Sequence, residues 1–90
     1  MEASAHILVK GMVQGVGFRY FVHQRATALG LNGWVRNLYD GNVEITVEGD
    51  RSLIEEFIGM VKVGPRLARV NDLLIEWNPP TGVLKAFEVI

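Results

Sequence analysis

The chain has 90 residues, of which 49% are hydrophobic and 21% are charged, a balance typical of one folded domain rather than of a disordered segment. Nine basic and ten acidic side chains give a formal net charge of −1, so the composition provides no general attraction to nucleic acid. The absence of cysteine excludes disulfides, thiolate catalysis and cysteine-ligated zinc, and no apolar run is long enough to span a membrane. The N-terminal residues lack a secretory signal pattern, so we expect a cytoplasmic protein without a membrane partner.

The first half of the chain predicts a strand, a helix and a hairpin. Residues 6–13 alternate between apolar and polar side chains, which indicates a half-buried strand. Apolar residues then recur at helical spacing over 18–29, and Gly30 is placed to end that helix. Extended runs at 34–38 and 43–48 flank a turn sequence and so predict a hairpin. In its second arm Val43, Ile45 and Val47 are expected to face inwards, and Glu44, Thr46 and Glu48 to face outwards.

The second half predicts another helix and more extended structure. A helix is expected from about Ser52 to Gly64, with Ser52 and Glu55 matching a capping box. Residues 70–77 are extended and largely apolar, and a proline loop separates them from a short last strand at 86–90.

The resulting element order is β-α-β-β-α-β, with a short extra pairing around the proline loop. This order predicts an α+β fold, a ferredoxin-like α/β sandwich in which an antiparallel sheet carries two helices on one face. Many unrelated activities share this fold, so the function has to be argued from the site.

The segment that joins the first strand to the first helix breaks a local rule. Arg19 falls in the first turn of the helix, where the free N–H groups carry partial positive charge and a basic side chain is disfavoured. A broken rule without a structural gain points to a functional site. The glycines before Arg19 allow a tight turn that gathers N–H groups around one point. The sequence thus outlines a site for a phosphate or a carboxylate.

Two segments resemble the two signatures of the acylphosphatases. The first is Gly11-Met12-Val13-Gln14-Gly15-Val16-Gly17-Phe18-Arg19, and the second is Gly33-Trp34-Val35-Arg36-Asn37 followed by Asp40-Gly41-Asn42-Val43 and Gly49. The resemblance extends over nearly the whole chain and implies a single acylphosphatase-like domain over residues 1–90. It implies an enzyme without metal or cofactor that hydrolyses acyl phosphates, giving a carboxylate and inorganic phosphate.

The resemblance also implies roles for individual residues. Arg19 grips the phosphoryl group and Asn37 positions the attacking water. The main-chain N–H groups of a phosphate-binding loop surround the rest of the phosphoryl group and, with Arg19, form a phosphate cradle. This loop consists of Gln14, Gly15, Val16, Gly17, Phe18 and Arg19. An amide does not take up a proton near neutral pH, so we expect a phosphate oxygen of the substrate to accept the proton of the water. The substrate is a small molecule, and the protein is expected to be a monomer.

Each of these residues also has an ordinary structural interpretation. Arg19 would then form a surface ion pair, and Asn37 would belong to the turn that follows it. His23, one helical turn after Arg19, is interpreted as a partly exposed helix residue rather than as a catalytic base.

Three other functions remain to be weighed. One is a carbamoyl-phosphate-handling domain like that of the hydrogenase-maturation carbamoyltransferases, which are long chains with zinc-finger segments. RNA-recognition domains share the fold but expose aromatic residues in a basic motif, whereas the second hairpin arm exposes Glu44, Thr46 and Glu48. A non-catalytic anion-binding protein would use the same cradle without requiring Asn37. A free-standing enzyme is preferred, without a nucleic-acid partner.

Overall fold

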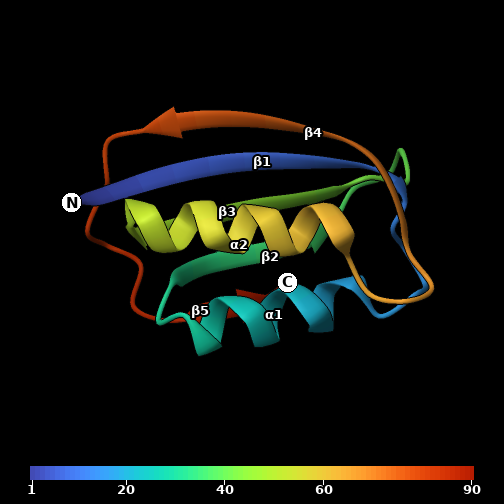
Figure 1. The fold of residues 1–90 in the computed structure, drawn as a ribbon, viewed down its shortest axis with the longest axis horizontal. Helices are drawn as coiled ribbons and strands as arrows, with labels where there is room; N and C mark the ends of the chain where they lie inside the picture. The colour runs from blue at the N-terminus through green and yellow to red at the C-terminus, as the bar shows by residue number, and fades with distance from the viewer.

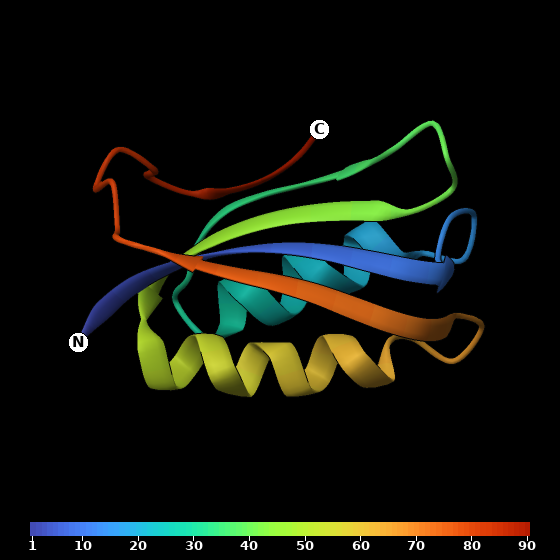
Figure 2. The ribbon, with the colours of Figure 1, turned by 90° about the horizontal axis from the view of Figure 1, so that it is seen from above.

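The computed structural model describes the whole chain, from Met1 to Ile90. Two helices cover one face of a five-stranded sheet (Figures 1 and 2), which confirms the predicted ferredoxin-like α+β fold. The elements in chain order are β1 (Glu2–Met12), α1 (Phe18–Ala28), β2 (Asn32–Asn37), β3 (Val43–Asp50), α2 (Arg51–Val63), β4 (Arg69–Asn78) and β5 (Phe87–Val89).

The strands lie in the order β4-β1-β3-β2-β5, and the sheet is mixed. The β1–β3, β1–β4 and β2–β3 pairs are antiparallel as predicted, whereas β5 runs parallel to β2, with Phe87 beside Gly33. The parallel pair arises because the proline loop carries the chain from the end of β4 across to the end of the sheet where β2 begins. The short last strand predicted at 86–90 is β5, which forms the edge of the sheet, and its pairing with β2 is the extra pairing expected around the proline loop.

The core lies between the sheet and the two helices. Val43, Ile45 and Val47 of β3 are completely buried on the face that meets the helices, as the alternation predicts. Phe18 of α1 and Phe57 of α2 are the largest fully buried side chains on the helical side. Packing of this kind fixes the register of β3, because a slip of one residue would move its apolar side chains to the other face.

The N-terminus of α2 differs from the predicted capping box. The helix begins at Arg51, one residue early, so Asp50 takes the N-cap position and its carboxylate accepts the Ser52 N–H at 3.0 Å. Glu55 instead accepts from Arg51 Nε at 3.1 Å. The Ser52 hydroxyl and the amino group of Met1 hold the pKa of Asp50 at about 2. The prediction of Ser52 as the cap was wrong because aspartate is an equally good cap.

Glu48 also departs from the prediction that it faces outwards into solvent. Its side chain lies on the face opposite the helices, but only 7% of the residue is exposed because the loop between β4 and β5 covers it. The carboxylate accepts the Thr81 N–H at 2.9 Å, the Thr81 hydroxyl at 2.8 Å and the Gly82 N–H at 3.2 Å. Burial raises the pKa of Glu48, but these hydrogen bonds outweigh burial and leave the pKa below its ordinary value.

Candidate active site

Two segments that are distant in sequence meet at one end of the sheet. Both β1 and β2 are antiparallel to the strand between them, β3, so they run in the same direction and end on the same side. The loop 13–17 follows the end of β1, and Asn37 is the last residue of β2. The topology therefore brings the predicted phosphate-binding loop to the predicted water-positioning residue.

The loop leads into α1 with its main-chain donors unused. None of the N–H groups from Gln14 to Arg19 donates to a main-chain carbonyl oxygen, and no side chain caps the helix at Gly17. Gly15 and Gly17 have φ angles of 74° and 76°, which L side chains rarely adopt. A Cβ on either glycine would meet no atom within 4 Å, so the conformation rather than a lack of space calls for glycine. Such a row of free donors at a helix N-terminus suits an anion.

Arg19 has no side-chain carboxylate partner. Its guanidinium is exposed and makes one hydrogen bond, from Nη1 to the main-chain oxygen of Ile90 at 3.4 Å. The first turn of α1 contains no acidic residue, and Arg19 is not among the ion pairs of the protein. The structure therefore shows no ion pair between Arg19 and an acidic side chain. The guanidinium adds positive charge to a helix end that already carries it, which is favourable only toward an anion.

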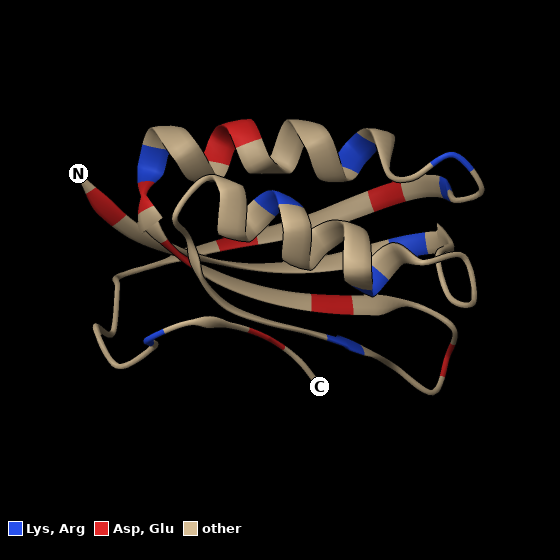
Figure 3. Cartoon of the chain, turned by 90° about the horizontal axis from the view of Figure 1, so that it is seen from below, with Lys and Arg blue, Asp and Glu red and all other residues tan.

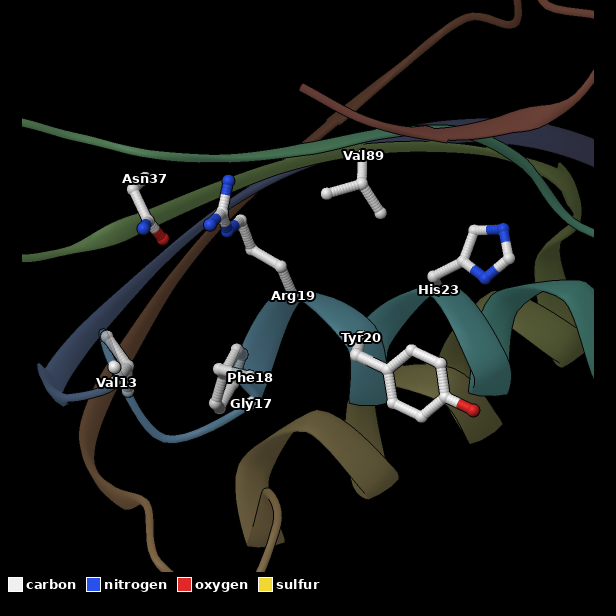
Figure 4. A pocket seen from close by; sticks show the side chains of 9 residues that line it. Val13, Gly17, Phe18, Arg19, Tyr20, His23, Asn37 and Val89 are labelled. Carbon is white, nitrogen blue, oxygen red and sulfur yellow. The ribbon is translucent and has the colours of Figure 1, made fainter.

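Asn37 faces the same space from β2. Its side chain projects toward the guanidinium of Arg19 (Figure 4) and makes no hydrogen bond within the protein. Asn37 still belongs to the strand, opposite Val43 in the β2–β3 ladder, so it lies before the turn rather than in it. An amide in this position has both an acceptor and donors available to a ligand or a water.

Gln14 fastens the loop to the hairpin that carries Asn37. Its Nε2 donates to the carbonyl oxygen of Leu38 at 2.7 Å and to that of Asn42 at 2.8 Å. From the sequence, only a main-chain role is predicted for Gln14, because a glutamine in a glycine-rich loop gives no signal of its hydrogen-bond partners. The side chain fixes the distance between loop and hairpin.

A cavity of about 600 Å³ lies over the loop and the start of α1. It brings together Arg19, Asn37, Phe18 and both loop glycines, but Gln14 and Val16 do not line it. Tyr20 on α1 and Val89 on β5 also line it, and neither is predicted from the sequence because neither belongs to a motif. The complete lining is Val13, Gly15, Gly17, Phe18, Arg19, Tyr20, His23, Asn37 and Val89.

The rest of the surface shows no concentration of one charge, no metal-ligand cluster and no membrane-spanning helix. Basic and acidic residues are both scattered over the fold rather than gathered into one patch of a single sign (Figure 3). No three histidine, aspartate or glutamate side chains gather closely enough to hold a metal ion. Neither helix has the length and apolar character that a membrane crossing demands.

Comparison with known sequences identifies the family. A sequence model described as Acylphosphatase matches residues 5–89, nearly the whole chain. The chain belongs to the acylphosphatase family. It is therefore an enzyme of acyl phosphate hydrolysis, in agreement with the resemblance of its two signatures.

Individual relatives agree with this assignment. The chain is 53% identical over 78 residues to an acylphosphatase of Moorella thermoacetica, an alignment that covers 87% of this chain and 84% of that one. Its structure resembles the acylphosphatase from Bacillus subtilis with a TM-score of 0.95 and 38% identity, covering 100% and 99% of the two chains. It also resembles a segment of T. kodakarensis HypF, with a TM-score of 0.85 and 40% identity, over 98% of this chain and 12% of that one.

Proposed function

We propose that Arg19 and the main-chain N–H groups from Gln14 to Arg19 hold the phosphoryl group of an acyl phosphate, and that Asn37 positions the attacking water. The observation that carries this proposal is the row of unused N–H donors beside an arginine that pairs with no acidic side chain. A planar guanidinium binds two phosphate oxygens side by side, and the N–H groups meet the remaining charge.

The reaction breaks the bond between phosphorus and the acyl oxygen. Water attacks phosphorus, the acyl oxygen leaves as part of a carboxylate, and inorganic phosphate is the second product. A carboxylate is a good leaving group, so the step requires no strong general acid. Catalysis then consists of positioning the water and stabilising charge on the equatorial oxygens. Fixed main-chain donors serve this purpose without reorganisation.

The proton of the water needs an acceptor. Asn37 cannot serve, because an amide does not take up a proton near neutral pH. The cavity lining contains no carboxylate, and its one histidine, His23, lies on the far side of Arg19 from Asn37 (Figure 4). We assign the proton to a phosphate oxygen of the substrate. The monomeric state and a cytoplasmic location stay predictions of the sequence.

The direct test is hydrolysis of acetyl phosphate by the purified protein, with and without a chelator. We expect turnover in both samples, because Arg19 and the main-chain donors supply the positive charge. Absence of turnover by folded protein would contradict the proposed activity. Loss of turnover only on chelation would contradict the metal-independent mechanism while leaving the activity intact.

A further inference from the structure

The cavity extends beyond the space between Arg19 and Asn37. In Figure 4, Asn37 lies on one side of the Arg19 guanidinium, whereas Val89, Tyr20 and His23 lie on the other. The attacking and leaving oxygens of a phosphoryl transfer lie roughly in line on opposite sides of phosphorus. A water held at Asn37 therefore directs the leaving acyl group away from Asn37, toward these three side chains.

We propose that Tyr20 and Val89 form an acyl subsite that favours planar or apolar acyl groups, such as an aromatic ring, over a small one. The proposal rests on the proposed function of Asn37 and deepens it, because it names the part of the substrate that the far end of the cavity receives. The phosphate cradle recognises what all acyl phosphates share, and this subsite distinguishes between them.

The walls of the acyl subsite are apolar and suit an aromatic or apolar acyl group. Tyr20 is 66% exposed and Val89 is 46% exposed, so two apolar surfaces border the cavity from different elements, α1 and β5. Gln24 Nε2 lies 3.1 Å from the Tyr20 hydroxyl and restrains the ring on the surface of α1. An exposed, restrained ring gives a planar group a surface for stacking or edge contact.

The far wall is built from His23. Its ring makes an edge contact with Phe87 of β5, with centroids 6.2 Å apart. This contact links α1 to the strand that carries Val89. Since no acidic side chain lines the cavity, the carboxylate product leaves without repulsion from its walls.

A second hollow adjoins Asn37 and provides the alternative place for the acyl group. It is lined by Gln14, Arg36, Asn37, Leu38 and Tyr39, and it shares only Asn37 with the first cavity. Tyr39 is fully exposed there. On the in-line argument this hollow does not receive the acyl group. Tyr39 is therefore a matched control for Tyr20, since both are exposed tyrosines next to the site.

The experiment compares kcat/KM for benzoyl phosphate with kcat/KM for acetyl phosphate in the wild type and in Tyr20→Ala, Tyr20→Phe and Tyr39→Ala. In Tyr20→Ala we expect the benzoyl-to-acetyl ratio to fall about three- to tenfold, the range of a lost aromatic contact. Tyr20→Phe keeps the ring but loses the hydrogen bond from Gln24, so the ratio should stay closer to the wild-type value than in Tyr20→Ala. Tyr39→Ala should keep the wild-type ratio. Val89→Ala should lower the ratio in the same direction as Tyr20→Ala, because the same group contacts both side chains.

Two outcomes would overturn the proposal. A ratio that falls in Tyr39→Ala but not in Tyr20→Ala would place the acyl group in the second hollow. A ratio unchanged in all four variants would mean that no acyl subsite exists at either tyrosine. Failure of the proposed role of Asn37 is distinguishable from both, because Asn37→Ala would then keep the wild-type kcat for both substrates, whatever the ratios in the other variants. Competitive inhibition by inorganic phosphate verifies that each variant retains the cradle.

Discussion

Gln14 Nε2 donates to the carbonyl oxygen of Leu38 at 2.7 Å, which fastens the proposed phosphate-binding loop to the residue that follows Asn37. A second bond to the carbonyl oxygen of Asn42 completes a link between the loop and both sides of the hairpin turn. The two proposed catalytic parts, Arg19 after the loop and Asn37 before the turn, are thus held together by one amide group.

Removal of this link should affect catalysis more than phosphate binding. We predict that Gln14→Ala lowers kcat for acetyl phosphate about 10- to 100-fold, because displacements of the order of 1 Å misalign the water and the phosphorus. Gln14→Glu preserves the size of the side chain but removes both donors, so kcat should fall in this variant as well. Wild-type kcat in both variants would show that the link has no catalytic role.

Catalysis should require the planar shape of the Arg19 guanidinium, which can bind two phosphate oxygens, as well as its positive charge. We predict that Arg19→Gln lowers kcat/KM on the order of 10²- to 10³-fold, as for other lost transition-state donors. Arg19→Lys should recover only part of the loss, because an ammonium group does not bind two phosphate oxygens side by side. Arg66→Gln removes the same charge from an exposed position outside the cavity lining, and it controls for a general effect of net charge. Equal losses in Arg66→Gln and Arg19→Gln would contradict a specific role.

The conformation of Gly17 should matter for stability as well as for binding. Its φ of 76° disfavours alanine, so Gly17→Ala should lower the free energy of unfolding by about 1–2 kcal/mol and weaken inhibition by phosphate. Gly59 lies within α2, and a Cβ there would meet no atom within 4 Å, so Gly59→Ala should raise the free energy of unfolding by about 0.5–1 kcal/mol. Urea unfolding of both variants measures these changes, and the same sign for both would contradict the assignment.

Glu48 should stabilise the fold in a pH-dependent manner. Its folded pKa lies below its ordinary value of 4.5, so its contribution is present above about pH 4.5 and is lost as the pH falls through the folded pKa. We predict that Glu48→Gln lowers the free energy of unfolding by about 1–3 kcal/mol at neutral pH, because charge-assisted hydrogen bonds to Thr81 and Gly82 are lost.

The difference between wild type and Glu48→Gln should shrink as the pH falls from about 7 to about 3. Urea unfolding at several pH values measures it, and Glu56→Gln, at an exposed position on α2, is the matched control. A difference that grows on acidification would contradict the carboxylate as the stabilising form.

The sequence predicts the fold well where a single element determines the pattern. The alternation in β3 and the helical spacing from Phe18 onwards are local, and both are confirmed. The signatures also contain Arg19 and Asn37, which the structure brings to one cavity, and their catalytic roles stay predictions. The sequence does not predict that β5 runs parallel to β2 or that Glu48 is buried. Both features depend on where the loop between β4 and β5 crosses the sheet. Tyr20 and Val89 reach the cavity only through tertiary structure.

We propose two separate roles in the site: Arg19 and the loop bind phosphate, and Asn37 orients the attacking water. The most direct test measures kcat and the inhibition constant of inorganic phosphate together in Asn37→Ala. The account predicts that kcat falls on the order of 10²-fold while the inhibition constant remains close to the wild-type value. A phosphate affinity that collapses in Asn37→Ala, or a kcat that does not change, would contradict the assigned role of Asn37.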